Sequence, residues 1–381
     1  MEQSVHFDYI IIGNGLAGLQ LALRMEEDNF FSDKKIALID PSKKNSNDKT
    51  WSFWETEPSR WNSLVYKSWE ETSIITSKEY IPFNLYPYSY KTIRSIDFYT
   101  EAKNRLKNSN NFQFIKQSVL SIDQTNTLLV KTENNSYSAS HVFDSRIPSD
   151  FSKNSKNHIS LIQHFKGWMI KTEKETFNDS QFTMMDYRLK DSNQCTFMYV
   201  LPFSKNEALI EFTYFTEHVV QEKTYNEFIE TYIKDYLKID NYSIIETEMG
   251  QIPMTTFPFH KFNTNKITKI GTAGGWVKGS TGYSFKNTEK KTVKIIENLK
   301  DNQLPSKGLF KKRFRFYDKV FLKVLKDENY KGEWIFSQFY KKNNPVTIFR
   351  FLDEESTFIE ELKVMNSLFS WSFIKAFFKT L

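Results

Sequence analysis

Tyr9-Ile-Ile-Ile-Gly-Asn-Gly-Leu-Ala-Gly-Leu-Gln20 is the stretch of the chain that decides its fold. A short apolar run, mostly β-branched, ends at Gly13, Gly15 and Gly18, and a helical pattern of Leu and Ala follows. A strand, a tight turn and a helix in this order build a dinucleotide site. Gly13 permits the turn, Gly15 lets the backbone approach a pyrophosphate, and Gly18 lets the helix pack closely on the strand.

The context of these glycines favours a dinucleotide site over a glycine-rich turn in an unrelated α/β protein. Lys35-Ile-Ala-Leu-Ile-Asp40 predicts a second strand, and Asp40 lies where a carboxylate meets an adenosine ribose. The phosphate charge would sit at the helix N-terminus, where free N–H groups point at it. We therefore predict that the three glycines, Leu16 and Ala17 between them, and Asp40 bind the cofactor.

Composition limits the class of protein. The 381 residues allow two or three domains, and 52 Lys and Arg stand against 46 Asp and Glu. This excess is too small and dispersed to predict nucleic-acid binding, although it permits attraction to anionic lipid. A single cysteine, Cys195, excludes an internal disulfide framework, and six scattered histidines give no reason to predict a metal site.

The apolar residues predict a soluble or peripheral enzyme of the cytosol. No segment approaches the roughly 18 to 20 uninterrupted apolar residues of a membrane span. The run Ile10 to Ile12 has no basic region ahead of it, which predicts a strand and not a signal peptide. The 35 Phe, 19 Tyr and 8 Trp belong mostly to the core, but their number leaves room for a long apolar ligand cavity.

Residues 47–55 are rich in aromatic and polar groups and lack a clear period, so we expect a loop there. Such a loop would either line a site or form a surface excursion pinned by Trp51 and Trp54. Further on, residues 98–107 predict a helix. The strands predicted next include residues 112–115 and 119–122, with a hairpin near Asn134.

His141-Val-Phe-Asp144 predicts another strand of the first sheet, and Ser145 and Arg146 follow it directly. A strand that ends in this way presents polar groups at the carboxyl edge of the sheet, where cofactors bind. We therefore predict that Asp144 and Arg146 contact the cofactor.

The pattern changes between residues 158 and 255, where four strand-like runs separated by polar turns predict an antiparallel sheet. A strand at residues 266–270 then leads into a second glycine-rich segment, residues 271–285. We expect this segment to return to the nucleotide domain and to place Gly271, Gly274 and Gly275 against the cofactor.

The predicted architecture is α/β, with a Rossmann-like nucleotide domain formed by residues 1–157 and 256–300. A mostly antiparallel substrate domain, residues 158–255, is inserted between them, and residues 301–381 form a helical C-terminal region. The basic, aromatic segments 309–326 and 357–381 have the composition of interfacial helices. They could equally pack on the protein with Lys stems over apolar surface; we favour membrane contact for the tail only.

Several separate segments resemble the lycopene cyclase family, the flavin-dependent carotenoid cyclases of bacteria and plants. They run in the family's order over nearly the whole chain, and the second and fifth are the most specific: Asn47-Asp-Lys-Thr-Trp-Ser-Phe-Trp-Glu55, Gln163-His-Phe-Lys-Gly-Trp168, Leu201-Pro-Phe203 with Ala208-Leu-Ile-Glu-Phe-Thr-Tyr214, Gly250-Gln-Ile-Pro-Met254, Gly271 to Phe285, and Phe349-Arg-Phe-Leu-Asp-Glu-Glu355.

The resemblance implies FAD, active in its reduced form, in a fold like that of the aromatic hydroxylases, with NAD(P)H as the reductant. It implies a cyclase that converts the linear ψ ends of lycopene to β rings, giving γ- and then β-carotene, with no net redox change. Because lycopene dissolves in the bilayer, it further implies a cytoplasmic enzyme held peripherally on the inner face of the membrane.

Glu211 is the predicted catalytic carboxyl. It lies in Leu209-Ile-Glu-Phe-Thr213, an otherwise apolar strand where a carboxylate is costly unless it is used. In the family, the glutamate that matches Glu211 is tied to catalysis, but Phe212 stands where the next acidic residue is usual. The alternative is that Glu211 lies on a solvated strand face.

Other polar residues of these segments receive weaker assignments. By family analogy Asp48 and Glu55 lie near the site, but we expect them to fix their loop through backbone hydrogen bonds. A structural role is likewise expected for His164 and Lys166, while Lys278 could approach the flavin.

Two rival functions remain. The first is a flavin monooxygenase acting on an apolar substrate, and the second is a non-catalytic carotenoid- or flavin-binding protein.

Overall fold

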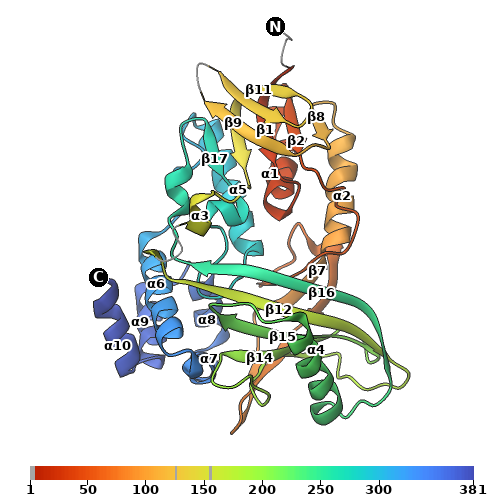
Figure 1. Cartoon of the computed structure of the whole chain (residues 1–381), viewed down its shortest axis with the longest axis vertical. Coiled ribbons are helices and arrows are strands. Elements are labelled where there is room, and N and C mark those ends of the chain that lie inside the picture. The colour runs from red at the N-terminus through yellow and green to blue at the C-terminus, as the bar shows by residue number, and fades with distance from the viewer. Residues whose placement is uncertain (1–4, 125–126, 154–156) are drawn as a thin grey trace.

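The computed structural model describes residues 5–124, 127–153 and 157–381. In Figure 1 the unit that contains β1 and α1 occupies the upper half, a long twisted sheet crosses the lower half, and the C-terminal helices lie beside that sheet. The site lies where these three parts meet.

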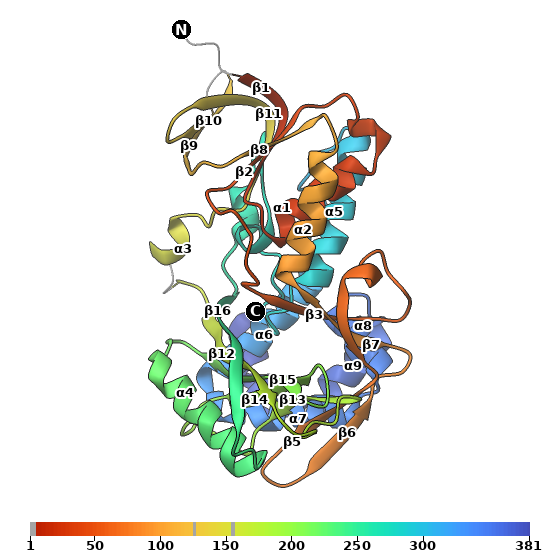
Figure 2. The same cartoon turned by 90° about the vertical axis from the view of Figure 1, so that its right-hand side faces the viewer.

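The first sheet has the order β8-β2-β1-β11-β10-β9, and β17 pairs with β11. Strands β8, β2, β1, β11 and β17 run parallel to one another. β10 pairs in antiparallel fashion with both β11 and β9. Helices α1, α2 and α5 pack on one face of this sheet (Figure 2). The elements are β1 (Val5–Ile12), α1 (Leu16–Glu26), β2 (Ile36–Ile39), α2 (Ser95–Lys107), β8 (Phe112–Ile115), β9 (Val119–Gln124), β10 (Leu128–Thr132), β11 (Ser136–Asp144), α3 (Asp150–Lys153), β17 (Ile267–Lys269) and α5 (Phe285–Lys300).

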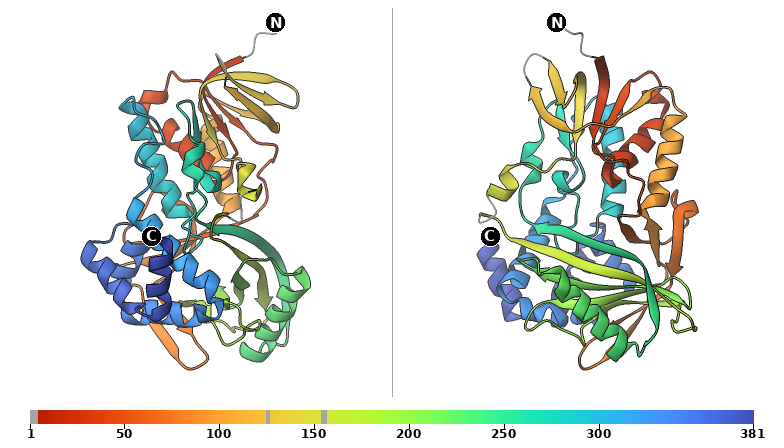
Figure 3. Two further views of the ribbon diagram at one scale, coloured as in Figure 1. Left: turned by 60° about the vertical axis from the view of Figure 1, so that its left-hand side comes forward. Right: turned by 45° about the vertical axis from the view of Figure 1, so that its right-hand side comes forward.

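The second sheet has the order β16-β12-β15-β14-β13-β5-β6, with every pair antiparallel except β5 and β13. Figure 3 shows α4 on one side of this sheet and the C-terminal helices on the other. The elements are β5 (Glu71–Ile75), β6 (Tyr80–Asn84), β12 (Ser160–Thr172), β13 (Gln181–Asp186), β14 (Thr196–Pro202), β15 (Glu207–Thr216), α4 (Glu222–Thr231) and β16 (Tyr242–Thr255).

Strand pairing corrects the predicted domain boundary at residue 157. β5 and β6 lie within residues 1–157, yet they extend the second sheet. Short strands carry no mark of the sheet they will join, since that choice depends on contacts with residues about a hundred positions away. The return of the chain to the first sheet at β17 is as expected.

A third sheet, β3-β7-β4, links the two halves and corrects the loop predicted at residues 47–55. β3 (Thr50–Glu55) pairs with β7 (Ser89–Arg94), which pairs with β4 (Val65–Trp69). Both faces of β3 are covered, because Trp51 packs on Phe98 and Trp54 packs on Phe349. A strand covered on both faces shows no alternation of apolar and polar residues, which hid it from the sequence pattern.

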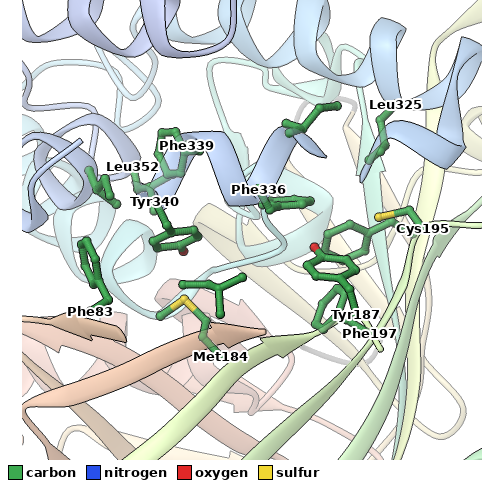
Figure 4. Close-up of a cluster of buried hydrophobic side chains, with 14 of the residues drawn as sticks. Phe83, Met184, Tyr187, Cys195, Phe197, Leu325, Phe336, Phe339, Tyr340 and Leu352 are labelled. Carbon is green, nitrogen blue, oxygen red and sulfur yellow. The ribbon is translucent and has the colours of Figure 1, made fainter. Parts of the chain in front are cut away.

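The C-terminal region is a layer of helices on the second sheet. It contains α6 (Lys312–Asp327), α7 (Gly332–Lys342), α8 (Pro345–Leu352), α9 (Phe358–Ser367) and α10 (Trp371–Thr380). Figure 4 shows Phe336, Phe339 and Tyr340 on the helix side facing Met184 and Phe197 on the sheet side. Across the described ranges of the chain, no helix combines the length and apolar character needed to cross a membrane.

Candidate active site

The turn between β1 and α1 is built around its glycines. Gly13 has φ of +100°, and a Cβ on it would lie 2.0 Å from the Oγ of Ser145. A Cβ on Gly18 would lie 2.0 Å from the carbonyl oxygen of Gly13, so both positions exclude a side chain. A Cβ on Gly15 would meet nothing within 4 Å, and no side chain caps the first turn of α1. The turn therefore offers open space and free N–H groups where a pyrophosphate would lie.

Asp40 lies at the end of β2, beside this turn. Its carboxylate accepts hydrogen bonds from the backbone N–H groups of Asn14 and Ser42, both at 2.7 Å. The side-chain oxygen of Asn14 is buried and has no hydrogen-bond partner within the described residues. An acid fixed at this edge and an unused buried acceptor both fit a nucleotide with ribose hydroxyls to donate.

The second glycine segment packs against the first. A Cβ on Gly271 would lie 3.2 Å from the Cβ of Ala17, next to Leu16 in the first turn of α1. Gly271 and Gly275 both have positive φ, and a Cβ on Gly274 would lie 2.5 Å from the carbonyl oxygen of Lys269. The predicted cofactor residues of both segments thus converge at the carboxyl edge of the first sheet.

The side chains of Asp144 and Arg146 form an ion pair with each other. Arg146 Nε and Lys269 Nζ donate to the buried Asp144 carboxylate at 3.0 and 2.7 Å. Burial alone would raise the pKa of Asp144, but the two cations bring it below its ordinary value. This ion cluster ties β17 to β11, and the adjacent Ser145 is the side chain that faces Gly13.

A row of residues crosses four strands of the second sheet and brings two carboxyl groups together. In register across β16, β12, β15 and β14 lie Glu248, Gly167, Glu211 and Tyr199. Gly167 has no side chain, so the two carboxyl groups approach each other across it closely enough to interact. A Cβ on Gly167 would lie 3.3 Å from Glu248 Cγ and 3.4 Å from Glu211 Cβ. Sequence reasoning missed Glu248, although it lies two residues before the conspicuous Gly250-Gln-Ile-Pro-Met254 segment.

The environment of this pair favours a bound proton. Glu211 is only 7% exposed, which overturns the alternative of a solvated strand face. Burial first, and then the neighbouring Glu248, raise the pKa of Glu211 well above its ordinary value, although Thr213 donates to it at 2.7 Å. Burial also raises the pKa of Glu248 to about 7, while Thr50 donates to it at 2.9 Å.

Residues that alternate with this row face the other side of the sheet. Phe212 stacks on Phe228, so an acid at position 212 would point away from Glu211. His164 bonds to Tyr225 and Thr216 on the same side. Lys166 pairs there with Glu222 of α4. The structural role predicted for His164 and Lys166 is therefore confirmed.

The side chain of Glu211 lines a cavity that lies between the second sheet, β3, the second glycine segment and the C-terminal helices. Within the described chain it is the one Asp, Glu, Lys, Arg or His side chain that lines this cavity, and Glu248 is not part of the lining. The hydroxyl of Tyr90 bonds to those of Tyr199 and Tyr283 at 2.8 and 2.9 Å. The other walls are mostly apolar, including Trp51, Phe165, Met184, Phe197, Phe215, Ile252, Phe285, Phe336, Phe339 and Leu352.

The remaining acids predicted near the site fix the chain around it. Asp48 accepts hydrogen bonds from Ser95 and Tyr99, both at 3.0 Å. Glu55 is buried between Lys91 and Lys286. Both acids thus anchor the chain, but through side-chain hydroxyl groups and lysines and not through the backbone hydrogen bonds that we expected.

Two further side chains of the predicted site are engaged elsewhere. Trp54 donates to Asp353 at 3.0 Å and belongs to the core, whereas Trp51 and Tyr283 line the cavity. Lys278 is buried in ion pairs with Asp318 and Glu354. Its charge is thus already compensated within the protein.

A stability measurement can test the raised pKa of Glu211. In the unfolded chain this carboxyl loses its proton near its ordinary value of 4.5, whereas the folded protein retains the proton to higher pH. The free energy of unfolding should therefore fall by about 1.4 kcal/mol per pH unit between these two pKa values. Glu211→Gln should remove this contribution and flatten the dependence between pH 5 and 8, as measured by urea unfolding. Equal slopes in the two proteins would contradict a raised pKa.

The family model described as "Lycopene cyclase protein" matches residues 8–377. The chain belongs to the lycopene cyclase family. Among curated relatives of this family member, "Neoxanthin synthase, chloroplastic" of Solanum tuberosum is 27% identical over 300 residues. "Capsanthin/capsorubin synthase, chromoplastic" of Capsicum annuum is 25% identical over 300 residues. Each match covers 73% of this chain but only 57% of the relative.

Solved structures share the fold of this lycopene cyclase family member at low sequence identity. The geranylgeranyl bacteriochlorophyll reductase-like protein of Thermoplasma acidophilum superposes with a TM-score of 0.61 at 12% identity, covering 99% of this chain and 100% of its own. The flavin-dependent brominase Bmp2 gives 0.58 at 13% identity, with 96% and 93% covered. Halogenase PltM gives 0.55 at 11% identity, with 90% and 78% covered. These likenesses confirm the predicted fold class.

Proposed function

We propose that this chain is a carotenoid cyclase that closes the linear ψ ends of lycopene into β rings with reduced FAD bound. The observation that carries the proposal is the buried Glu211, which has the half-buried Glu248 as its neighbour and faces a mostly apolar, aromatic cavity beside the two glycine segments. An acid that keeps its proton in a dry cavity suits a substrate that has no polar group to activate.

The chemistry requires one proton that is given and then recovered. Glu211 donates its proton to C2 of the ψ end, the 5,6 double bond closes the C1–C6 bond, and positive charge appears at C5. Loss of the C6 proton to the carboxylate leaves a β ring and restores the acid. No electrons are gained or lost, so lycopene and product are isomers. The ring faces of Tyr90, Tyr199 and Tyr283 can stabilise the cation by about 1 to 2 kcal/mol each.

The turn between β1 and α1 and the second glycine segment together form a cradle, and its residues fit FAD. Open space at Gly15, the unused acceptor of Asn14, Asp40, and the meeting of Gly271 with Ala17 would hold its nucleotide and pyrophosphate. When bound in its reduced form, FAD supplies a fixed negative charge that stabilises a nearby cation. We propose NAD(P)H as the source of the electrons that reduce it.

Anaerobic turnover tests this function. The FAD-loaded protein is incubated with lycopene in liposomes and dithionite, and products are followed by absorbance and chromatography. We expect γ- and β-carotene to form without O2 and without net oxidation of the flavin. Absence of cyclised product from fully loaded protein would overturn the proposal.

A flavin monooxygenase is the second candidate, because PqsL of Pseudomonas aeruginosa, described as a probable FAD-dependent monooxygenase, is among the proteins of the same fold. Such an enzyme would consume O2 and NADPH in proportion to product. That chemistry does not need a pair of carboxyl groups with raised pKa values, and their presence here favours the cyclase. Oxygen-dependent NADPH consumption with an apolar substrate, together with no anaerobic cyclisation, would favour the monooxygenase.

Glu248→Gln should move the pH profile of turnover. The ionised Glu248 raises the pKa of Glu211, so removing its charge lets Glu211 lose its proton at lower pH. We expect the decline of kcat on the alkaline side to begin at least about one pH unit earlier, since one unit corresponds to a change of only about 1.4 kcal/mol. Glu222→Gln, on the opposite face of the sheet, is the matched control and should keep the wild-type profile. A uniform loss of rate at every pH would mean that Glu248 has only a structural role.

A further inference from the structure

A second cavity lies among the C-terminal helices, and its lining is almost entirely apolar. Helices α6 to α10 supply its walls, with Ser280 and Thr281 of the second glycine segment at one end. The acid that reaches it, Asp318, is paired with Lys278 at 3.0 Å. The apolar lining residues include Phe316, Val320, Phe321, Ile335, Phe351, Val364, Leu368, Phe373, Ile374 and Phe377.

This helical cavity borders the cavity that contains Glu211. Thr281, Phe336, Phe339 and Leu352 line both of them. Figure 4 shows Phe336, Phe339 and Leu352 along the helices above the sheet. Because the same side chains line both cavities, a single layer of side chains separates them. The three apolar members of this partition are buried.

Part of the lining of the helical cavity is an exposed apolar rim. Met365, Phe369, Phe377 and Phe378 line the cavity and are 40%, 71%, 41% and 69% exposed. Exposed lysines on α10, Lys375 and Lys379, lie in sequence beside the last two of these residues. Large apolar side chains interleaved with lysines are typical of a helix that lies in a lipid interface. An apolar ligand could therefore pass from lipid into the cavity without crossing water.

We propose that the helical cavity holds the polyene chain of the substrate, takes it up from anionic lipid at the rim, and presents one end to Glu211. The proposal rests on the cyclase function. The chain of a C40 polyene is far longer than the part that reacts, and the helical cavity offers it apolar walls up to the partition. Ring closure concerns only the end that passes Phe336, Phe339 and Leu352.

Filling the helical cavity tests this assignment. Leu368, directly after the end of α9, is buried and lines it, whereas Leu362 within α9 is 47% exposed and does not. Full-length FAD-loaded wild type, Leu368→Trp and Leu362→Trp are assayed with lycopene and with pseudoionone, a C13 ketone with the same ψ end. We expect the ratio of lycopene to pseudoionone turnover to fall at least tenfold in Leu368→Trp and to stay at the wild-type value in Leu362→Trp. An unchanged ratio in Leu368→Trp would overturn the proposal, while wild type that cyclises neither compound would overturn the cyclase function itself.

The rim is tested separately with the double substitution Phe369→Lys and Phe378→Lys. Sedimentation with vesicles of phosphatidylcholine and phosphatidylglycerol should fall at least tenfold, and so should the ratio of turnover from vesicles to turnover from detergent micelles. Added lysines strengthen electrostatic attraction to these vesicles, so a loss must come from the apolar contact. Wild-type sedimentation and an unchanged ratio would overturn entry at the rim.

Discussion

Glu211→Gln is expected to lower the turnover of lycopene about 10³-fold, within the range that a positioned general acid contributes. The amide has nearly the shape of the carboxylic acid and can still accept the hydrogen bond from Thr213. It has no proton to give to C2. Turnover is measured anaerobically with reduced FAD, and flavin content and melting temperature are compared with those of the wild type.

Glu207→Gln is the matched control for this substitution. Glu207 lies on the same strand, β15, but pairs with Lys171 away from the cavity. We expect its turnover to stay within about twofold of the wild type. Cyclised product from Glu211→Gln at the wild-type rate would preserve the cyclase function but remove Glu211 from its role.

Gly15→Val is expected to abolish FAD binding and, with it, all turnover. A side chain at Gly15 has free space in the folded chain, and its φ of −86° suits any residue. The valine would occupy the space where the pyrophosphate must approach the backbone. The purified variant should therefore fold, melt close to the wild-type apoprotein, and carry no flavin absorbance.

Gly18→Ala provides the contrast. Its added methyl would lie 2.0 Å from the carbonyl oxygen of Gly13, so α1 must shift relative to β1 and the melting temperature should fall. FAD bound by Gly15→Val at the wild-type stoichiometry would show that the cradle between the glycine segments is not the cofactor site.

Local patterns in the sequence predicted much of this structure. The strand, turn and helix around Gly13 are specified within twelve residues, and a strained turn leaves few alternatives to glycine. Glu211 was also recognisable, because a carboxyl within an apolar strand is conspicuous whatever lies beside it. The family resemblance added weight to both assignments.

Features that depend on distant pairing were not predictable in this way. Glu248 becomes significant only when β16 and β15 lie on either side of Gly167, and nothing near residue 248 reveals that register. β3 was hidden because both of its faces are covered. The assignment of β5 and β6 to the second sheet likewise depends on β13, about a hundred residues away.

The missing side chain at Gly167 lets backbone geometry set the contribution that Glu248 makes to the proton affinity of Glu211, beside the larger effect of burial. The spacing of the two carboxyl groups is fixed by hydrogen-bonded strands on both sides of that position, not by a loop that opens and closes. Glu248 would therefore act on Glu211 in the same way at every turnover, whereas a movement of the helical layer would change only how far Glu211 is shielded from water.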